Sequence, residues 1–77
     1  MNKSRIKRIQ DLAETLKLAH EELGYIIDEE SYALYNMPES LQETKKWQQD
    51  DKNLSELDDI KDKVEGLKDR LQEVVDA

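Results

Sequence analysis

Apolar residues recur at alternating spacings of three and four along both halves of this 77-residue chain. In the first half the repeat consists of Ile6, Ile9, Ala13, Leu16, His20, Leu23, Ile27, Glu30, Leu34 and Met37, of which His20 and Glu30 are polar. In the second half it consists of Leu54, Leu57, Ile60, Val64, Leu67, Leu71, Val74 and Val75, with Trp47 one heptad before Leu54. This spacing lines apolar side chains along one face of a helix, as in a coiled coil. The pattern therefore predicts an all-α protein with two long helices.

The ends of these helices follow from capping and helix-breaking residues. Ser4 is a suitable N-cap for the first helix, and Pro38 disfavours helical backbone in the residue before it. Thr44 or Ser40 can cap the second helix, and Pro38 can start a short helical turn between the two. The expected elements are a first helix at 4–35, a turn at 36–43 and a second helix at 44–76. So short a connection makes consecutive helices antiparallel neighbours.

The resulting hairpin has a thin core, because each helix packs against only one neighbour. The first helix has a wide apolar stripe, since Leu12, Ala19, Ile26 and Ala33 extend it on one side. The chain has no cysteine, so no disulfide reinforces it, and one small core supplies only about 3–5 kcal/mol. We therefore expect 1–77 to form a single domain, a coiled-coil-like antiparallel two-helix hairpin that dimerises into a four-helix bundle. The alternative is a monomer that a different protein covers.

The composition excludes several kinds of chemistry. The chain has no cysteine, one histidine and two glycines, which rules out thiol nucleophiles, His-rich metal centres and glycine-rich phosphate loops. We expect no enzymatic activity, no metal and no cofactor. The net charge of −7 repels phosphates, so direct nucleic-acid binding is not expected. No apolar run approaches the roughly 18 residues that a membrane span needs, and a cytoplasmic protein is expected.

An acidic ladder is predicted on the outer face of the second helix. Its members follow one another at steps of three and four: Asp51, Ser55, Asp58, Asp62, Glu65, Asp69, Glu73 and Asp76. Like charges one turn apart destabilise a helix by about 0.2–0.5 kcal/mol per pair, so helix stability alone would favour interrupting the ladder. One interpretation is a phosphate-like surface that competes for a nucleic-acid-binding protein. The other is a solvated face that keeps a small bundle in solution.

A second candidate surface lies on the outer face of the first helix. Leu18, Tyr25 and Tyr32 recur every seven residues opposite the core, with Glu22 and Glu29 beside them. Aromatic side chains in a line, rimmed by charge, are typical of protein–protein contacts. The alternative is that these are ordinary exposed apolar residues, which every protein surface contains.

Two further features lie at the ends of the hairpin. The basic start, which consists of Lys3, Arg5, Lys7 and Arg8, either contacts an acidic partner or is compensated by acidic residues near the C-terminus. At the other end, Trp47 and Met37 either close the core or anchor a partner at the turn.

The turn also carries a resemblance to known proteins. The run Asn36-Met37-Pro38-Glu39-Ser40-Leu41-Gln42, with Glu29-Glu30 upstream and the basic start, resembles a group of short phage and prophage proteins. Those proteins share a basic start, a helix, an Asn-Leu-Pro-Glu-Ser-Leu-Gln-like turn and an acidic second helix. Here Met37 stands where leucine is usual, and Glu43-Thr44-Lys45-Lys46 replaces a Ser-Glu-Arg-Gly-like segment. The resemblance implies a viral or mobile-element origin and a place in the host cytoplasm, and it implies no particular activity.

These features together predict a non-enzymatic, homodimeric protein-interaction module. Its sharper form is an acidic inhibitor or DNA mimic that acts on a nucleic-acid-binding host protein. The alternative is a structural oligomerisation protein without a host target.

Overall fold

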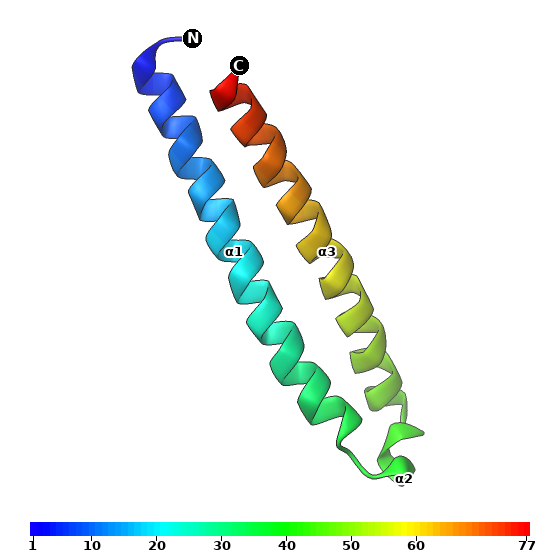
Figure 1. Cartoon of the computed structure of the whole chain (residues 1–77). Coiled ribbons are helices and arrows are strands. Elements are labelled where there is room, and N and C mark those ends of the chain that lie inside the picture. The colour runs from blue at the N-terminus through cyan, green and yellow to red at the C-terminus, as the bar shows by residue number, and fades with distance from the viewer.

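A computed structural model describes the whole chain, residues 1–77. It contains helix α1 (Lys3–Tyr35), the short helix α2 (Glu39–Gln42) and helix α3 (Lys45–Asp76). Helices α1 and α3 lie side by side and antiparallel over their whole length, and the molecule measures 59 × 15 × 14 Å (Figure 1). Both termini lie at one end, the open end, and α2 lies at the other, the tip. The predicted all-α antiparallel hairpin is confirmed.

The helix ends follow the capping side chains. Asn2, and not Ser4, is the N-cap of α1: its Oδ1 accepts a hydrogen bond of 2.8 Å from the N–H of Arg5. The helix therefore begins one residue earlier than predicted. Thr44 caps α3, since its Oγ1 accepts a hydrogen bond of 3.2 Å from the N–H of Trp47.

The tip is fastened by aromatic contacts and hydrogen bonds between α1 and α3. Leu34 is fully buried, and its carbonyl oxygen accepts a hydrogen bond of 2.8 Å from the indole N–H of Trp47. The ring of Tyr35 packs edge-on against Trp47, with ring centroids 5.8 Å apart. The hydroxyl of Tyr35 donates a hydrogen bond to Asp51. Trp47 thus closes the core at the tip, whereas Met37 is exposed.

The seam of α3 differs from the predicted one. Ile60, Leu67 and Val74, which were expected to face α1, are 38%, 49% and 46% exposed. Lys61 and Lys68 are half-buried in their place. A lysine tolerates this position because its methylene stem packs against α1 while the ammonium group reaches water. The helix is therefore rotated by about one residue relative to the prediction, which turns one apolar column away from α1.

The first helix has a similar local difference. Glu30 is exposed and Ser31 is half-buried instead, because a carboxylate without a partner is costly to bury. Across the chain only Ala13, Leu34 and Leu54 are buried. Most apolar side chains of the hairpin thus keep contact with water.

Candidate interaction surfaces

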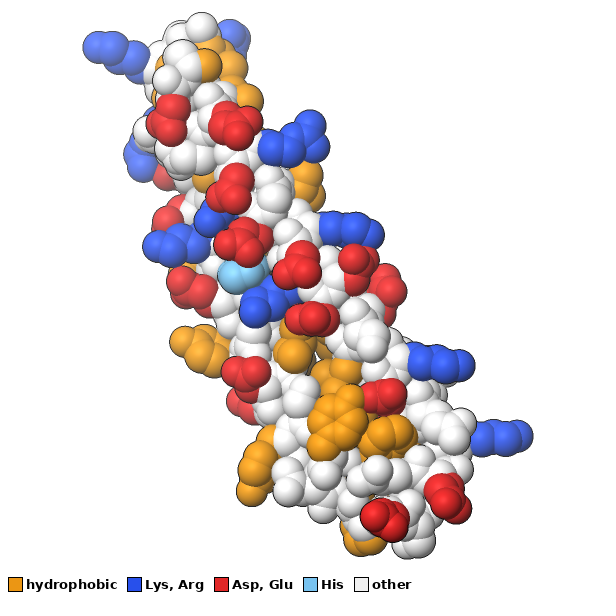
Figure 2. All heavy atoms as spheres, turned by 45° about the vertical axis from the view of Figure 1, so that its right-hand side comes forward, with side chains coloured by type: hydrophobic (Ala, Val, Ile, Leu, Met, Phe, Trp, Pro, Cys, Tyr) orange, Lys and Arg blue, Asp and Glu red, His pale blue; other side chains and the backbone are white.

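The two long helices leave the hairpin with two broad sides that differ in chemistry. On the polar side, Nε2 of His20 lies 3.4 Å from a carboxylate oxygen of Glu65, and Tyr35 binds Asp51. Figure 2 shows the side that carries the histidine, where acidic and basic side chains are intermixed and apolar ones gather mainly near the tip. This side is bridged by polar contacts within the chain.

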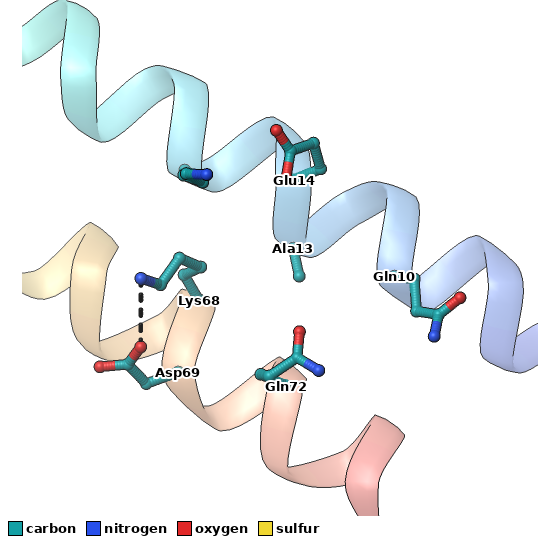
Figure 3. Close-up of a pocket in the computed structure, with 7 residues that line it drawn as sticks. Gln10, Ala13, Glu14, Lys68, Asp69 and Gln72 are labelled. Carbon is teal, nitrogen blue, oxygen red and sulfur yellow. Dashed lines mark ion pairs between the residues drawn. The ribbon is translucent and has the colours of Figure 1, made fainter.

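A groove of about 350 Å³ lies between the helices toward the open end of the polar side. Ala13 of α1 points across it toward α3, and Lys68, Asp69 and Gln72 line the opposite wall (Figure 3). Lys68 and Asp69 form an ion pair of 3.2 Å. The groove lacks the apolar walls typical of small-molecule sites and contains no nucleophile beside a general base. Its chemistry is that of a hydrated polar surface.

The opposite side of the hairpin is apolar. Ile26 and Asn53 line one hollow there, and Ala33 and Lys46 line another. Asn53 stands one heptad before Ile60, so the apolar column of α3 continues along the side on which Ile26 lies. The two columns together form what we call the apolar face, which consists of Leu12, Ala19, Ile26, Ala33, Ile60, Leu67 and Val74.

Each end of the apolar face contains a hollow with a charged rim. The tip hollow, of about 490 Å³, has apolar walls that include Ala33, Met37 and Trp47. Glu30 and Asp50 lie on its rim. The open-end hollow, of about 250 Å³, is lined by Met1, Arg5, Arg8, Ile9 and Leu12. The rim at the tip therefore carries two acids and Lys46, and the rim at the open end carries two arginines.

The predicted acidic ladder does not lie opposite the core. Because α3 is rotated, the ladder borders the seam on the polar side, and Asp51 is half-buried. Asp51 binds Tyr35, Glu65 lies against His20, and Asp69 pairs with Lys68. Three acidic side chains of the ladder therefore already have partners within the chain. Its remaining predicted site residues, Asp58, Asp62 and Glu73, are exposed.

The aromatic stripe is placed as its heptad spacing indicates. Leu18, Tyr25 and Tyr32 are 57%, 63% and 76% exposed along α1. Glu22 and Glu29, the acids predicted beside them, are exposed as well. These five residues form a solvent-facing strip that takes no part in the seam.

Two groups have raised pKa values. The hydrogen bond to Asp51, helped by desolvation and by the charge of that carboxylate, raises the pKa of Tyr35 above its ordinary value. The pKa of Lys63 is raised by its hydrogen bond to Asp59, at 2.7 Å, and then by the charges of Asp59 and Glu56. Both shifts favour the protonation state that each group already has at neutral pH, so neither produces a nucleophile or a general base.

The structure contains no group of three His, Asp or Glu side chains placed to hold a metal ion. Neither long helix has a segment apolar enough to cross a membrane. Comparisons with protein-family models, with curated proteins and with solved structures each find no match. The resemblance of the turn to phage and prophage proteins therefore stays a prediction from the sequence.

Proposed function

We propose that the protein is a non-enzymatic protein-interaction module that works as a homodimeric four-helix bundle. The observation that supports this most directly is the apolar face, which runs along the hairpin with Leu12 57% and Leu67 49% exposed. The chain exposes 6108 Å² of surface. A compact protein of 9.1 kDa exposes about 4,900 Å². The excess of about 1,200 Å² is larger than the roughly 800 Å² that each partner buries in a standard interface.

The aromatic stripe is the surface we assign to a second protein. Tyr25 and Tyr32 project from the outer side of α1, away from α3 and from the apolar face. A bundle that buries the apolar face therefore leaves both phenol rings accessible. Tyrosine anchors many interfaces because a large, stiff ring loses little conformational entropy on binding.

The sharper form of the proposal is a phage-encoded acidic inhibitor of a nucleic-acid-binding host protein. The net charge of −7 and the exposed Asp58, Asp62 and Glu73 favour it. The internal pairing of Asp51, Glu65 and Asp69 makes the ladder less like a row of phosphates, so the aromatic stripe ranks first. The second candidate is a structural oligomerisation protein without a host target. It would account for the apolar face but gives no role to the aromatic stripe.

Capture from host lysate with matched variants tests the proposal at low and high salt. We expect Tyr25→Ser/Tyr32→Ser to lose a protein that the wild type retains at both salt concentrations. The control Asp58→Asn/Asp62→Asn should retain it, because an aromatic contact is little screened by salt. A host protein that the wild type retains only at low salt, and that Asp58→Asn/Asp62→Asn fails to retain, would favour the DNA mimic. If no retained protein depends on either variant, the structural alternative holds.

A further inference from the structure

We propose that the two copies pack with their apolar faces together in a tip-to-open-end orientation, so that the tip hollow of each copy receives the open end of the other. This inference rests on the proposed dimer and adds the orientation of its copies. A two-fold dimer through one face has two alternatives. In the tip-to-tip dimer, α1 lies over α3 of the other copy. In the tip-to-open-end dimer, α1 lies over α1 and α3 over α3.

Charges along the rim of the apolar face distinguish the two orientations. On α1, Arg8 stands one turn from Leu12 near the open end, and Glu29 stands one turn from Ile26 toward the tip. The rim of α3 repeats this order. Arg70 is one turn from Leu67 toward the open end, and Glu56 is one turn from Ile60 toward the tip. Both helices thus change from basic to acidic along the same direction.

This charge order opposes the tip-to-tip dimer and favours the other one. With tips together, Arg8 of one copy approaches Arg70 of the other, and Glu29 approaches Glu56. With tip over open end, Arg8 approaches Glu29 and Arg70 approaches Glu56, each twice by symmetry. Lys63 then lies near its own copy at the middle, where Asp59 of the same chain already neutralises it at 2.7 Å.

Glu22 is the one rim residue that gains a favourable contact in the tip-to-tip dimer and not in the other. It lies at about the height of Lys63 on α3, so only that orientation brings the two together between copies. Because Lys63 already pairs with Asp59 of its own chain, this contact adds little. The two like-charged approaches at the ends therefore outweigh it.

The two hollows support the same orientation. Arg5 at the open end and Ala33 at the tip hollow belong to one heptad column of α1, about 42 Å apart at 1.5 Å per residue. A single copy cannot bring these ends together. A second copy, reversed end to end, places Arg5 over the acidic rim of the tip hollow at both ends of the dimer. Lys46, which pairs with Asp50 there at 3.1 Å, has an 86% exposed side chain and can move aside.

The apolar columns agree on one two-fold axis. The heptad positions of the α1 column run from Arg5 to Ala33, with Ala19 at their middle, and those of the α3 column run from Asn53 to Val74, with their middle between Ile60 and Leu67. The contact of His20 with Glu65 places these two midpoints at about the same height. One axis therefore serves both columns. It places Ala19 against Ala19 of the other copy where the two α1 helices cross. It also places Ile60 of each copy against Leu67 of the other.

Disulfide trapping reads the orientation directly, because the natural chain has no cysteine. Under oxidising conditions we expect Ala19→Cys to form a covalent dimer as the main band on a non-reducing gel. The matched control Ala33→Cys makes the same substitution on the same face, far from the axis, and should stay unlinked. The tip-to-tip dimer predicts no link at position 19, because that residue would face α3.

Charge reversal gives a second reading with opposite signs for the two orientations. Arg8→Glu should weaken dimerisation by about five-fold or more, and Arg8→Glu/Glu29→Arg should restore it. In the tip-to-tip dimer, Arg8→Glu would instead tighten association. A dimer that is unlinked at position 19 and tightened by Arg8→Glu overturns the orientation alone. A wild type that sediments as a monomer overturns the proposed dimer as well.

Discussion

Trp47 is the residue on which the geometry of the tip depends most. Its ring packs against Tyr35, and its indole N–H donates to the carbonyl oxygen of Leu34, the only fully buried large side chain. The hydrogen bond joins the last turn of α1 to the first turn of α3. A short loop whose flanking helices are joined in this way has little freedom to open.

Replacing the indole of Trp47 by a phenyl ring removes the hydrogen bond to Leu34 but keeps an aromatic ring beside Tyr35. We expect Trp47→Phe to lower the free energy of unfolding by about 1–2 kcal/mol, because the Leu34 carbonyl oxygen loses its donor. Urea unfolding followed by circular dichroism, at one fixed protein concentration, measures this. Lys52→Ala, at an exposed position of the same helix, is the control. Equal unfolding midpoints for Trp47→Phe and the wild type would contradict the role given to the hydrogen bond.

The raised pKa of Tyr35 predicts that the free energy of unfolding depends on pH in the alkaline range. Its pKa is raised in the folded chain by the hydrogen bond to Asp51, so the protonated phenol is stabilised by folding. The contribution is fully present below the ordinary tyrosine pKa of 10.0 and is lost as the pH rises through the raised value. The wild type should therefore exceed Tyr35→Phe in stability at neutral pH and lose this advantage above pH 10.0. Urea midpoints of both proteins across this range provide the measurement, and an advantage that grows with pH would refute the interpretation.

At the scale of the helices, much of the fold could be predicted from the sequence. The spacing of apolar residues, Pro38 and the cap Thr44 locate α1 and α3 to within about one residue. The column of α3 that faces α1 could not be chosen this way. Ile60 and Lys61 are neighbours, and hydrophobicity favours the isoleucine, whereas packing selects the lysine.

The packing of Lys61 depends on a residue of the other helix. Gly24 has no side chain, and the stem of Lys61 passes over it: a β-carbon at this position would lie 3.5 Å from Cε of Lys61. A glycine on one helix facing a lysine on the other was the available signal, but it requires the register to be known first. The acidic ladder was misplaced for the same reason, while the aromatic stripe, farther from the seam, was not.

The two glycines allow a matched test of this packing. Gly66 has nothing within 4 Å of an added β-carbon, so Gly66→Ala should stabilise α3 by about 0.5–1 kcal/mol through helix propensity. Gly24→Ala should gain at least as much, since its methyl group would meet Cε of Lys61 at an ordinary van der Waals distance of 3.5 Å. Urea unfolding of both variants under one set of conditions provides the comparison. A Gly66→Ala protein less stable than the wild type would show that α3 needs a bare backbone at that point.

The whole molecule combines a well-defined shape with very little interior. Three buried residues in a chain of this length leave the long helices without the core that usually holds such elements together. The apolar face offers a second layer of packing along nearly the full length of the hairpin. Assembly and stability should therefore be coupled, so that the unfolding midpoint rises with protein concentration.

Neutralising acids of the ladder should stabilise the protein and leave the dimer intact, whereas a charge on the apolar face should weaken the dimer. Asp58→Asn/Asp62→Asn removes a like-charge pair one turn apart and should stabilise the protein by a few tenths of a kcal/mol, with the oligomeric state unchanged. Thermal unfolding and sedimentation of this variant check both parts. Dissociation on neutralisation would mean that the ladder, and not the apolar face, holds the assembly.

Sedimentation equilibrium of the wild type beside Leu67→Asp shows whether a second copy covers the apolar face. Leu67 lies on the apolar face and outside the seam, so the aspartate should leave the hairpin itself helical by circular dichroism. We predict a wild type at twice the 9.1 kDa chain mass and a Leu67→Asp protein whose dimer is at least about ten-fold weaker, since the substitution buries a charge at the interface. A wild type that sediments as a stable 9.1 kDa monomer, or a Leu67→Asp protein as dimeric as the wild type, would mean that no second copy covers the apolar face.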